Sequence, residues 1–148
     1  LPDWLSLSAD HWEFTGGAHG NSTFDTLLWD KRANTMREPL SLFVSAKALE
    51  GAVQKDLCAM LDKQRAEKRG EPVVRDQSDW MNACIGLDSA TVILGSSNRR
   101  TFDRIGFLIP PYTAGPYVEG SYEVTLPVTQ AALATVKPEF RAAFSAVK

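Results

Sequence analysis

Residues 110–128 read Pro-Pro-Tyr-Thr-Ala-Gly-Pro-Tyr-Val-Glu-Gly-Ser-Tyr-Glu-Val-Thr-Leu-Pro-Val. The first eleven of them contain three prolines, two glycines and two tyrosines, and the rest alternate between apolar and polar side chains. Proline fixes φ and lacks an N–H donor, whereas glycine reaches φ values that other residues avoid. The stretch therefore predicts a rigid, shaped loop over residues 110–120 that enters a strand over Ser121–Val128.

Alternation of apolar and polar residues predicts further strands on the N-terminal side of this loop. They cover Leu5–Phe14, Ser22–Asp30, Ile85–Gly95 and Arg104–Ile109. The first two are joined by the glycine-rich segment Thr15–Asn21, and a short glycine-rich connection of this kind favours an antiparallel hairpin.

A long helix is predicted from Ser45 to about Arg69, with Ser45 as its N-cap and Gly70 as its stop. Shorter helices are expected near residues 130–136 and after Pro138. The order of strands, helix, strands and helix predicts one α+β domain over residues 1–148, with a mainly antiparallel sheet packed on the long helix. The apolar stripe of that helix consists of Leu49, Val53, Leu57, Met60 and Leu61.

The composition is that of an ordinary globular domain, with 44% hydrophobic and 23% charged residues and a net charge of −2. Basic residues cluster only between Lys63 and Arg69, on the predicted helix, so a nucleic-acid surface is not expected. The longest apolar runs, such as Phe107–Pro111, are far too short to cross a bilayer.

The chain contains two cysteines, Cys58 and Cys84. Two cysteines without nearby histidines cannot supply the four ligands of a structural zinc site. From the residues alone, two readings stay open: two buried free thiols, as in a cytosolic protein, or one disulfide in an exported protein.

His19 is the first candidate for catalysis, because it lies in a glycine-rich loop and could meet the carboxylate of Asp25 or Glu119. General-base catalysis needs such a pair within hydrogen-bond reach of a substrate proton. The simpler reading is that His19 hydrogen-bonds a backbone carbonyl and holds the hairpin turn. No nucleophile elbow, P-loop or dinucleotide fingerprint occurs, and neither a metal site nor a cofactor is expected.

The loop over residues 110–120 is the better candidate for binding. Tyrosine is a preferred interface residue, and Tyr112, Tyr117 and Glu119 could form a recognition edge for a basic protein or for glycan. In the alternative reading, Tyr117 and Tyr122 pack into the core and only position the next strand. The four tryptophans are assigned to the core or to a sheet face: Trp4, Trp12, Trp29 and Trp80.

Three segments together resemble a bacterial cell-envelope family. They are Phe-Thr-Gly-Gly-Ala-His at 14–19 followed by Phe24-Asp25, Pro-Leu-Ser-Leu-Phe at 39–43, and Pro-Tyr-x-x-Gly-Pro-Tyr-x-x-Gly-x-Tyr-Glu-Val-x-Leu-Pro at 111–127. The family is a domain of unknown function that forms the C-terminal part of RsiV-type anti-sigma factors and of PdaC-type peptidoglycan deacetylases. It also occurs in stand-alone envelope lipoproteins, and the resemblance extends from about Leu5 to Phe144.

The resemblance implies a periplasmic or extracellular location, which favours a Cys58–Cys84 disulfide. It also implies a non-catalytic role, because the deacetylases carry their chemistry in a separate domain and the anti-sigma factors recognise lysozyme through their extracellular part. The expected function is therefore binding or sensing of a lysozyme-like protein or peptidoglycan, through the loops around His19 and Tyr112–Glu119. The alternatives are a small periplasmic hydrolase using His19 and a structural accessory domain.

Family members carry additional sequence before the position of the first strand. The resemblance therefore implies that this chain lacks an N-terminal portion, which could hold a membrane anchor, a lipidated cysteine or a further domain.

Overall fold

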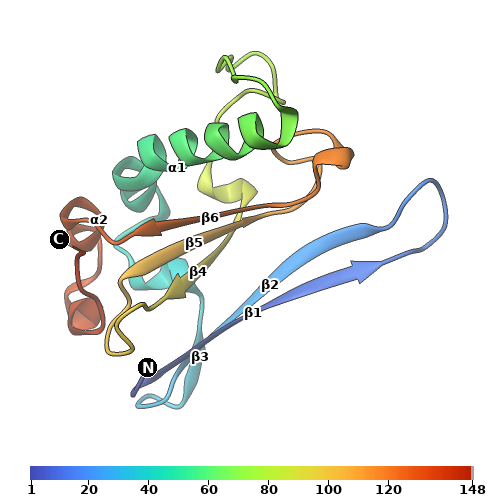
Figure 1. Ribbon diagram of the computed structural model, residues 1–148. Coiled ribbons are helices and arrows are strands. Elements are labelled where there is room, and N and C mark those ends of the chain that lie inside the picture. Colours follow the sequence, from blue (N-terminus) through green and yellow to red (C-terminus); the bar gives the residue numbers. More distant parts are fainter. Residues whose placement is uncertain (148) are drawn as a thin grey trace.

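The computed structural model describes residues 1–147 and has two three-stranded antiparallel sheets and one long helix (Figure 1). One sheet has the order β1-β2-β3 and the other the order β4-β5-β6. The expected α+β class is confirmed, with the strands divided between two sheets. The strands are β1 (Trp4–Glu13), β2 (Asn21–Asp30), β3 (Thr35–Arg37), β4 (Thr91–Gly95), β5 (Arg104–Ile109) and β6 (Tyr122–Pro127).

The long helix α1 (Ala46–Arg69) begins and ends where the sequence predicts. The Ser45 side chain accepts a hydrogen bond from the Ala48 N–H at 3.0 Å, and Gly70 ends the helix in the left-handed conformation, with φ of 74°. The remaining elements are the helix α2 (Gln130–Ala134) and the 3-10 helices η1 (Pro39–Leu42), η2 (Leu87–Ser89), η3 (Tyr117–Glu119) and η4 (Pro138–Ala143).

The core lies between α1 and one face of the β4-β5-β6 sheet, a unit called the body below (Figure 1). Val92, Phe107 and Val124 are register partners on adjacent strands, and all three are buried against the helix. The predicted stripe of α1 is buried except for Met60, which the structure places on the exposed edge of the helix.

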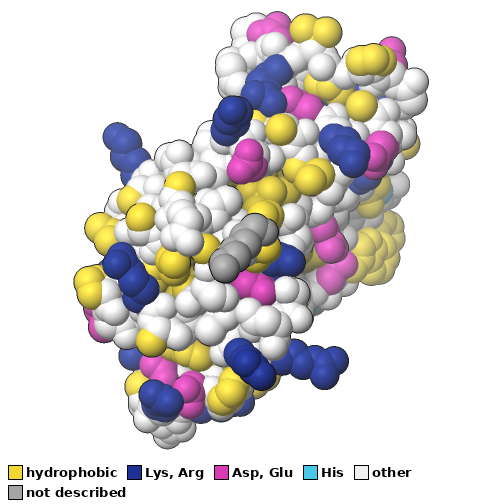
Figure 2. Space-filling model, turned by 60° about the vertical axis from the view of Figure 1, so that its left-hand side comes forward, with side chains coloured by type: hydrophobic (Ala, Val, Ile, Leu, Met, Phe, Trp, Pro, Cys, Tyr) yellow, Lys and Arg dark blue, Asp and Glu magenta, His cyan; other side chains and the backbone are white. Residues whose placement is uncertain are grey.

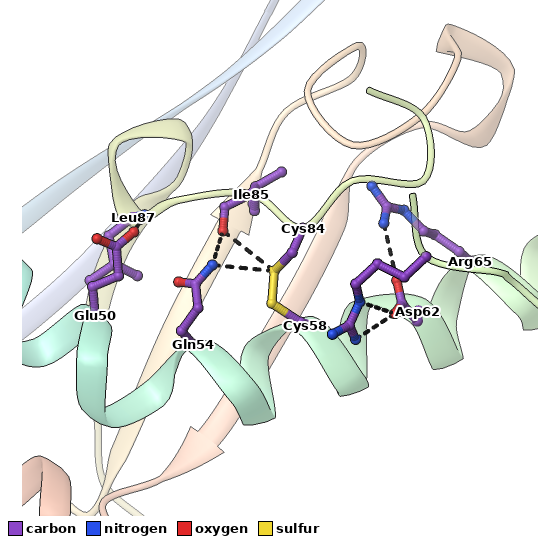
Figure 3. The surroundings of a disulfide bond; sticks show 9 residues. Glu50, Gln54, Cys58, Asp62, Arg65, Cys84, Ile85 and Leu87 are labelled. Carbon is purple, nitrogen blue, oxygen red and sulfur yellow. Dashed lines mark hydrogen bonds and ion pairs between the residues drawn. A yellow bond between two sulfur atoms is a disulfide. The ribbon is translucent and has the colours of Figure 1, made fainter. Parts of the chain in front are cut away.

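The predicted strand from Ile85 begins only at Thr91, so the first half of that prediction is wrong. Side chains of α1 bind the backbone groups that a strand would need for pairing (Figure 3). Gln54 donates to the Ile85 carbonyl at 2.8 Å, and Glu50 accepts from the Leu87 N–H at 3.1 Å. This segment is therefore attached to the helix and turns through η2 before β4 starts.

A disulfide joins Cys58 on α1 to Cys84 in the same segment, as expected from the resemblance (Figure 3). The two cysteines are 26 positions apart in the sequence. Closing a loop of that length stabilises the fold by roughly 3–4 kcal/mol in the chain-entropy model.

The β1–β2 hairpin pairs in continuous register from Trp4 with Asp30 to Glu13 with Asn21, which confirms the predicted hairpin. Its first residues pack beside β4, and its outer part projects away from the body (Figure 1). This outer part, residues 7–27, is called the arm below. Leu7 to Ala18 are all exposed. The arm is held by strand pairing, by contacts at its tip and, on β2, by a hydrogen bond from Thr91 Oγ1 of β4 to the Phe24 carbonyl at 3.1 Å.

Candidate recognition site at the arm tip

The loop that connects β5 to β6 is shaped as its sequence predicts. It turns sharply after Pro110, continues through η3 and ends at Gly120, whose φ is 67°. Tyr112 also has a positive φ of 67°, a conformation that few residues other than glycine adopt. This backbone geometry leaves the Tyr112 side chain exposed, at 53% of its full accessibility.

His19, in the arm tip, contacts two tyrosines of this loop across a large distance in sequence. Its ring stacks on that of Tyr117, with centroids 3.7 Å apart and planes inclined by 15°. His19 Nε2 lies 3.0 Å from Tyr112 Oη, and the two tyrosine rings are 5.6 Å apart. Three of the four predicted binding residues therefore form one group, called the His19–tyrosine cluster.

The hydrogen bonds of His19 identify which ring nitrogen carries the proton when the ring is neutral. Nδ1 lies 3.0 Å from the carbonyl oxygen of Gly20, which can only accept, so Nδ1 carries the proton. Nε2 is then the acceptor, and the Tyr112 hydroxyl donates to it. The backbone carbonyl contact is the one that the simpler sequence reading of His19 proposed.

Within residues 1–147, no carboxylate forms a hydrogen bond or an ion pair with His19. Asp25, one of the partners considered from the sequence, lies on β2 opposite Ala9, in the middle of the hairpin. The imidazole therefore has aromatic and backbone neighbours in place of the carboxylate that general-base chemistry needs.

Glu119, the fourth predicted residue, does not join the cluster. Its carboxylate lies against the end of α1, where Arg69 Nε and Nη2 donate to it at 2.7 and 3.1 Å. The Tyr122 hydroxyl donates to the same carboxylate, and Tyr122 is buried in the core, as the alternative sequence reading proposed. Glu119 is thus a structural anchor that fixes the end of the loop on the helix.

The protonation of this anchor follows from its burial and its partners. Burial raises the pKa of the Glu119 carboxyl, but the hydrogen bonds from Arg69 and Tyr122 outweigh burial and lower that pKa below its ordinary value. Burial and the hydrogen bond to Glu119 together raise the pKa of Tyr122 to about 12. The pair is therefore an ionised carboxylate and a neutral phenol at neutral pH.

Two aromatic residues of β1 extend the cluster over the arm. Trp12 and Phe14 stack with centroids 6.5 Å apart, and their exposed fractions are 61% and 56%. Trp12 lies directly on Gly20, where a Cβ atom would come within 2.5 Å of the indole. Together with the His19–tyrosine cluster, these two residues form what is called the arm-tip surface: Trp12, Phe14, His19, Tyr112 and Tyr117.

Sequence reasoning assigned Trp12 only generally, to the core or a sheet face, and did not consider Phe14 for binding. The sequence did indicate that Trp12 and Phe14 face solvent, because the same face of β1 carries the polar residues Ser6, Ser8 and Asp10. A strand face with that composition is typical of a surface exposed to solvent. Two large aromatic residues at the end of such a face indicate a contact surface.

Charge is distributed unevenly along the chain. The first 30 residues contain five acidic residues and no lysine or arginine. On the face of the molecule drawn in Figure 2, by contrast, basic side chains are scattered singly with acidic ones between them. Three of the acidic residues lie in the arm, which is therefore an acidic projection that carries exposed aromatic rings, whereas Asp3 and Asp30 lie outside it and pair with Arg32 and Arg37. The five acidic residues are Asp3, Asp10, Glu13, Asp25 and Asp30.

Comparison with known proteins supports the fold. The chain is similar in structure to a DUF3298 family protein from Pseudomonas aeruginosa PAO1, with a TM-score of 0.55 and 20% sequence identity. The match covers 98% of this chain and 59% of that protein, so the chain spans less than two thirds of its length. No family model matches the sequence, and no curated protein matches it. The resemblance to a domain of unknown function thus holds at the level of fold.

Two further findings concern residues 1–147. None of their helices combines the length and the apolar character needed to cross a membrane. They also contain no group of three or more His, Cys, Asp or Glu side chains arranged to hold a metal ion.

Proposed function

We propose that this chain is a non-catalytic binding or sensing module of the bacterial cell envelope that recognises a basic, lysozyme-like protein through the arm-tip surface. The observation that carries the proposal is the combination of acidic charge on one projecting hairpin with exposed aromatic side chains on that hairpin and on the loop that contacts its tip. Trp12, Phe14 and Tyr112 are each more than half exposed.

The aromatic residues suit a binding surface because they are large and already ordered. Tyr and Trp contribute contact area at a small cost in side-chain entropy, and they are enriched among the residues that dominate binding energies. Tyr112 is held by its hydrogen bond to His19, and Trp12 by its contacts with Phe14 and Gly20. Ordering before binding reduces the entropy lost on binding.

The charge of the arm favours a basic protein over peptidoglycan. Asp10, Glu13 and Asp25 have no basic residue between Leu1 and Asp30 to neutralise them. Complementary charge raises the association rate and excludes partners of like charge. Peptidoglycan carries free carboxylates of its own, although its sugars would stack on exposed aromatic rings.

An exported location fits the disulfide, because such bonds persist in oxidising compartments. We place the module in the periplasm or at the outer cell surface, in the manner of the RsiV-type and PdaC-type proteins it resembles.

The hydrolase alternative has no supporting contact, since the described carboxylates make none with His19. A purely structural accessory domain would not need the exposed rings of Trp12 and Tyr112. If the following experiment detects no bound ligand, the result favours the structural accessory domain.

The test measures binding of purified lysozyme and of purified peptidoglycan to the wild-type chain and to two variants, Tyr112→Ala and Trp12→Ala. The matched control is Trp80→Ala, because Trp80 is similarly exposed, at 51%, and lies outside the arm. We expect lysozyme binding to weaken at least tenfold in both arm-tip variants, a loss of about 1.4 kcal/mol or more, and to be unchanged in the control.

Binding should also weaken with added salt, because acidic side chains of the arm contribute to it. Retention on peptidoglycan alone would contradict the proposed partner. Lysozyme binding that survives both arm-tip substitutions would contradict the proposed surface, and failure to retain either ligand would favour the structural accessory domain.

A further inference from the structure

The outer edge of β1 has no strand beside it within the described part of the chain. β1 is the first strand of the order β1-β2-β3, so only one of its edges is paired. Seven consecutive residues on it, 7–13, are exposed, and Figure 1 shows them on the margin of the hairpin. The open edge is therefore about seven residues long.

The register of the hairpin identifies the backbone groups that face outward. The Lys31 N–H donates to the Asp3 carbonyl at 2.9 Å, so residues 3 and 31 are a hydrogen-bonded pair. Such pairs alternate with non-bonded ones along an antiparallel ladder, so the odd-numbered residues of β1 bond to β2. The N–H and C=O groups of Ser8, Asp10 and Trp12 point away from β2 and have no strand to bond to.

The edge of β2 over residues 21–27 also lacks a neighbouring strand, because β3 pairs only with residues 28–30, but Ser22, Phe24 and Thr26 on it are half-buried. The remaining sheet edges are short or covered. α1 side chains bind backbone carbonyls of β6 and of the residue before it: Gln64 donates to Glu123 O at 2.8 Å, and Lys68 donates to Ser121 O at 2.6 Å. β3 has only three residues. β4 lies against β2, where Thr91 Oγ1 donates to Phe24 O at 3.1 Å.

Proteins usually block a long open edge with charged side chains, above all lysine, with proline or with a bulge, since such an edge pairs readily with another chain. The charged side chains of this edge, Asp10 and Glu13, are acidic and would repel only another acidic strand. Residues 7–13 contain no lysine and no proline, and the continuous register shows no bulge. The edge is thus left competent for pairing. Its charge indicates what pairs with it.

Asp10 and Glu13 lie on the edge strand itself, and Asp25 is on the neighbouring strand opposite Ala9. A second copy of β1 would bring like charges together, which destabilises a strand pair. An extended segment with lysine or arginine would instead place opposite charges beside these carboxylates. Charge therefore selects a basic strand over self-association.

We propose that β1 is a strand-addition site, at which an extended basic segment of a partner protein pairs with Ser8, Asp10 and Trp12 and becomes a fourth strand of the β1-β2-β3 sheet. In this mode backbone hydrogen bonds supply affinity and alternate side chains supply specificity. The site goes beyond the proposed function, because it uses the backbone of the β1 edge, whereas the arm-tip surface uses aromatic side chains.

The probe is a ten-residue peptide of alternating lysine and valine, added to the wild-type chain while the backbone amides are followed by NMR and hydrogen exchange. We expect the amides of Ser8, Asp10 and Trp12 to shift and to become protected at least tenfold. A peptide of the same sequence with alternate backbone nitrogens methylated keeps the charge but cannot complete the ladder. It should bind at least tenfold more weakly, and a glutamate–valine peptide should not bind.

Ser8→Pro removes an N–H that faces solvent, which an edge strand tolerates, and Ser8→Ala keeps that N–H as the matched control. The proline variant should lose peptide binding at least tenfold, and the alanine variant should retain it. The methylated peptide provides the decisive comparison if the proline variant does not fold.

Equal binding of the methylated and parent peptides, or of the acidic and basic peptides, would overturn the proposal. So would protection confined to residues outside β1, or unchanged peptide binding by folded Ser8→Pro. Tyr112→Ala should leave peptide binding unchanged, so a failure at the edge is distinguishable from a failure of the arm-tip surface.

Discussion

The arm and the body are both antiparallel and both alternate between apolar and polar residues, yet their burial is opposite. In β4, β5 and β6 the apolar positions lie under α1, and Phe107 is fully buried. In β1, Trp12 occupies an equally regular alternating position and is 61% exposed. Alternation therefore identifies a strand, but a covering element decides whether its apolar face becomes core or surface.

The two regions are also held by different forces. The body is stabilised by packing of α1 on the sheet and by the disulfide from Cys58 to Cys84. The arm depends on its strand ladder, on the contacts of His19 with the two loop tyrosines at its tip, and on one hydrogen bond from Thr91 to the Phe24 carbonyl. Residues of the arm are consequently available for binding, whereas residues of the body are committed to stability.

The largest expected contrast comes from truncating one aromatic residue in each region. Phe107→Ala removes a fully buried ring and should lower the free energy of unfolding by about 3–5 kcal/mol. Trp12→Ala should lower it by about 1 kcal/mol or less, because most of the indole already contacts water. Urea denaturation of both variants measures the difference. Similar losses would show that the arm is part of the cooperative core.

A smaller loss of stability is expected at Glu119, where the loop over residues 110–120 is attached to α1. Glu119→Gln weakens the ion pair with Arg69 and should lower the free energy of unfolding at pH 7 by about 1–3 kcal/mol. The pKa of Glu119 is lower in the folded chain than in the unfolded one. Its contribution is therefore complete above the unfolded value, near 4.5, and is lost as the pH falls through the folded value.

The wild-type chain should thus lose more stability than Glu119→Gln between pH 7 and about pH 3.5, measured as the shift of the urea midpoint. Glu123→Gln is the matched control, since Glu123 is exposed on β6. Parallel pH profiles for the wild type and Glu119→Gln would exclude the anchoring role.

The smallest effect is expected at the arm tip itself. His19→Ala removes the stack on Tyr117 and the acceptor for Tyr112, and should change the free energy of unfolding by less than about 1 kcal/mol. Its consequence is local: amide exchange of residues 14–20 should accelerate, because the contacts that hold the tip are lost. His11→Ala, an exposed histidine of the same hairpin, should leave that exchange unchanged. Equal exchange in both variants would show that the tip is fixed by the hairpin alone.

Local patterns in the sequence predicted most elements correctly. The hairpin, the caps of α1 at Ser45 and Gly70, and the shaped loop before β6 were all found, because each depends on residues close together in the chain. The start of β4 was missed, since it depends on hydrogen bonds that the preceding segment makes with the side chains of Glu50 and Gln54 on α1. Glu119 was grouped with the tyrosines by its position in the loop, although its partner is Arg69.

The sequence by itself determined most of the strands, the bounds of α1 and the rigid loop over residues 110–120, but neither β3 nor the start of β4. These are consequences of side-chain periodicity and of the φ restrictions of proline and glycine, which act over a few residues. Only the tertiary structure decided that His19 meets Tyr112 and Tyr117 and that the edge of β1 stays open. Those features depend on how distant elements pack and on which surfaces are left uncovered, and no local pattern specifies that.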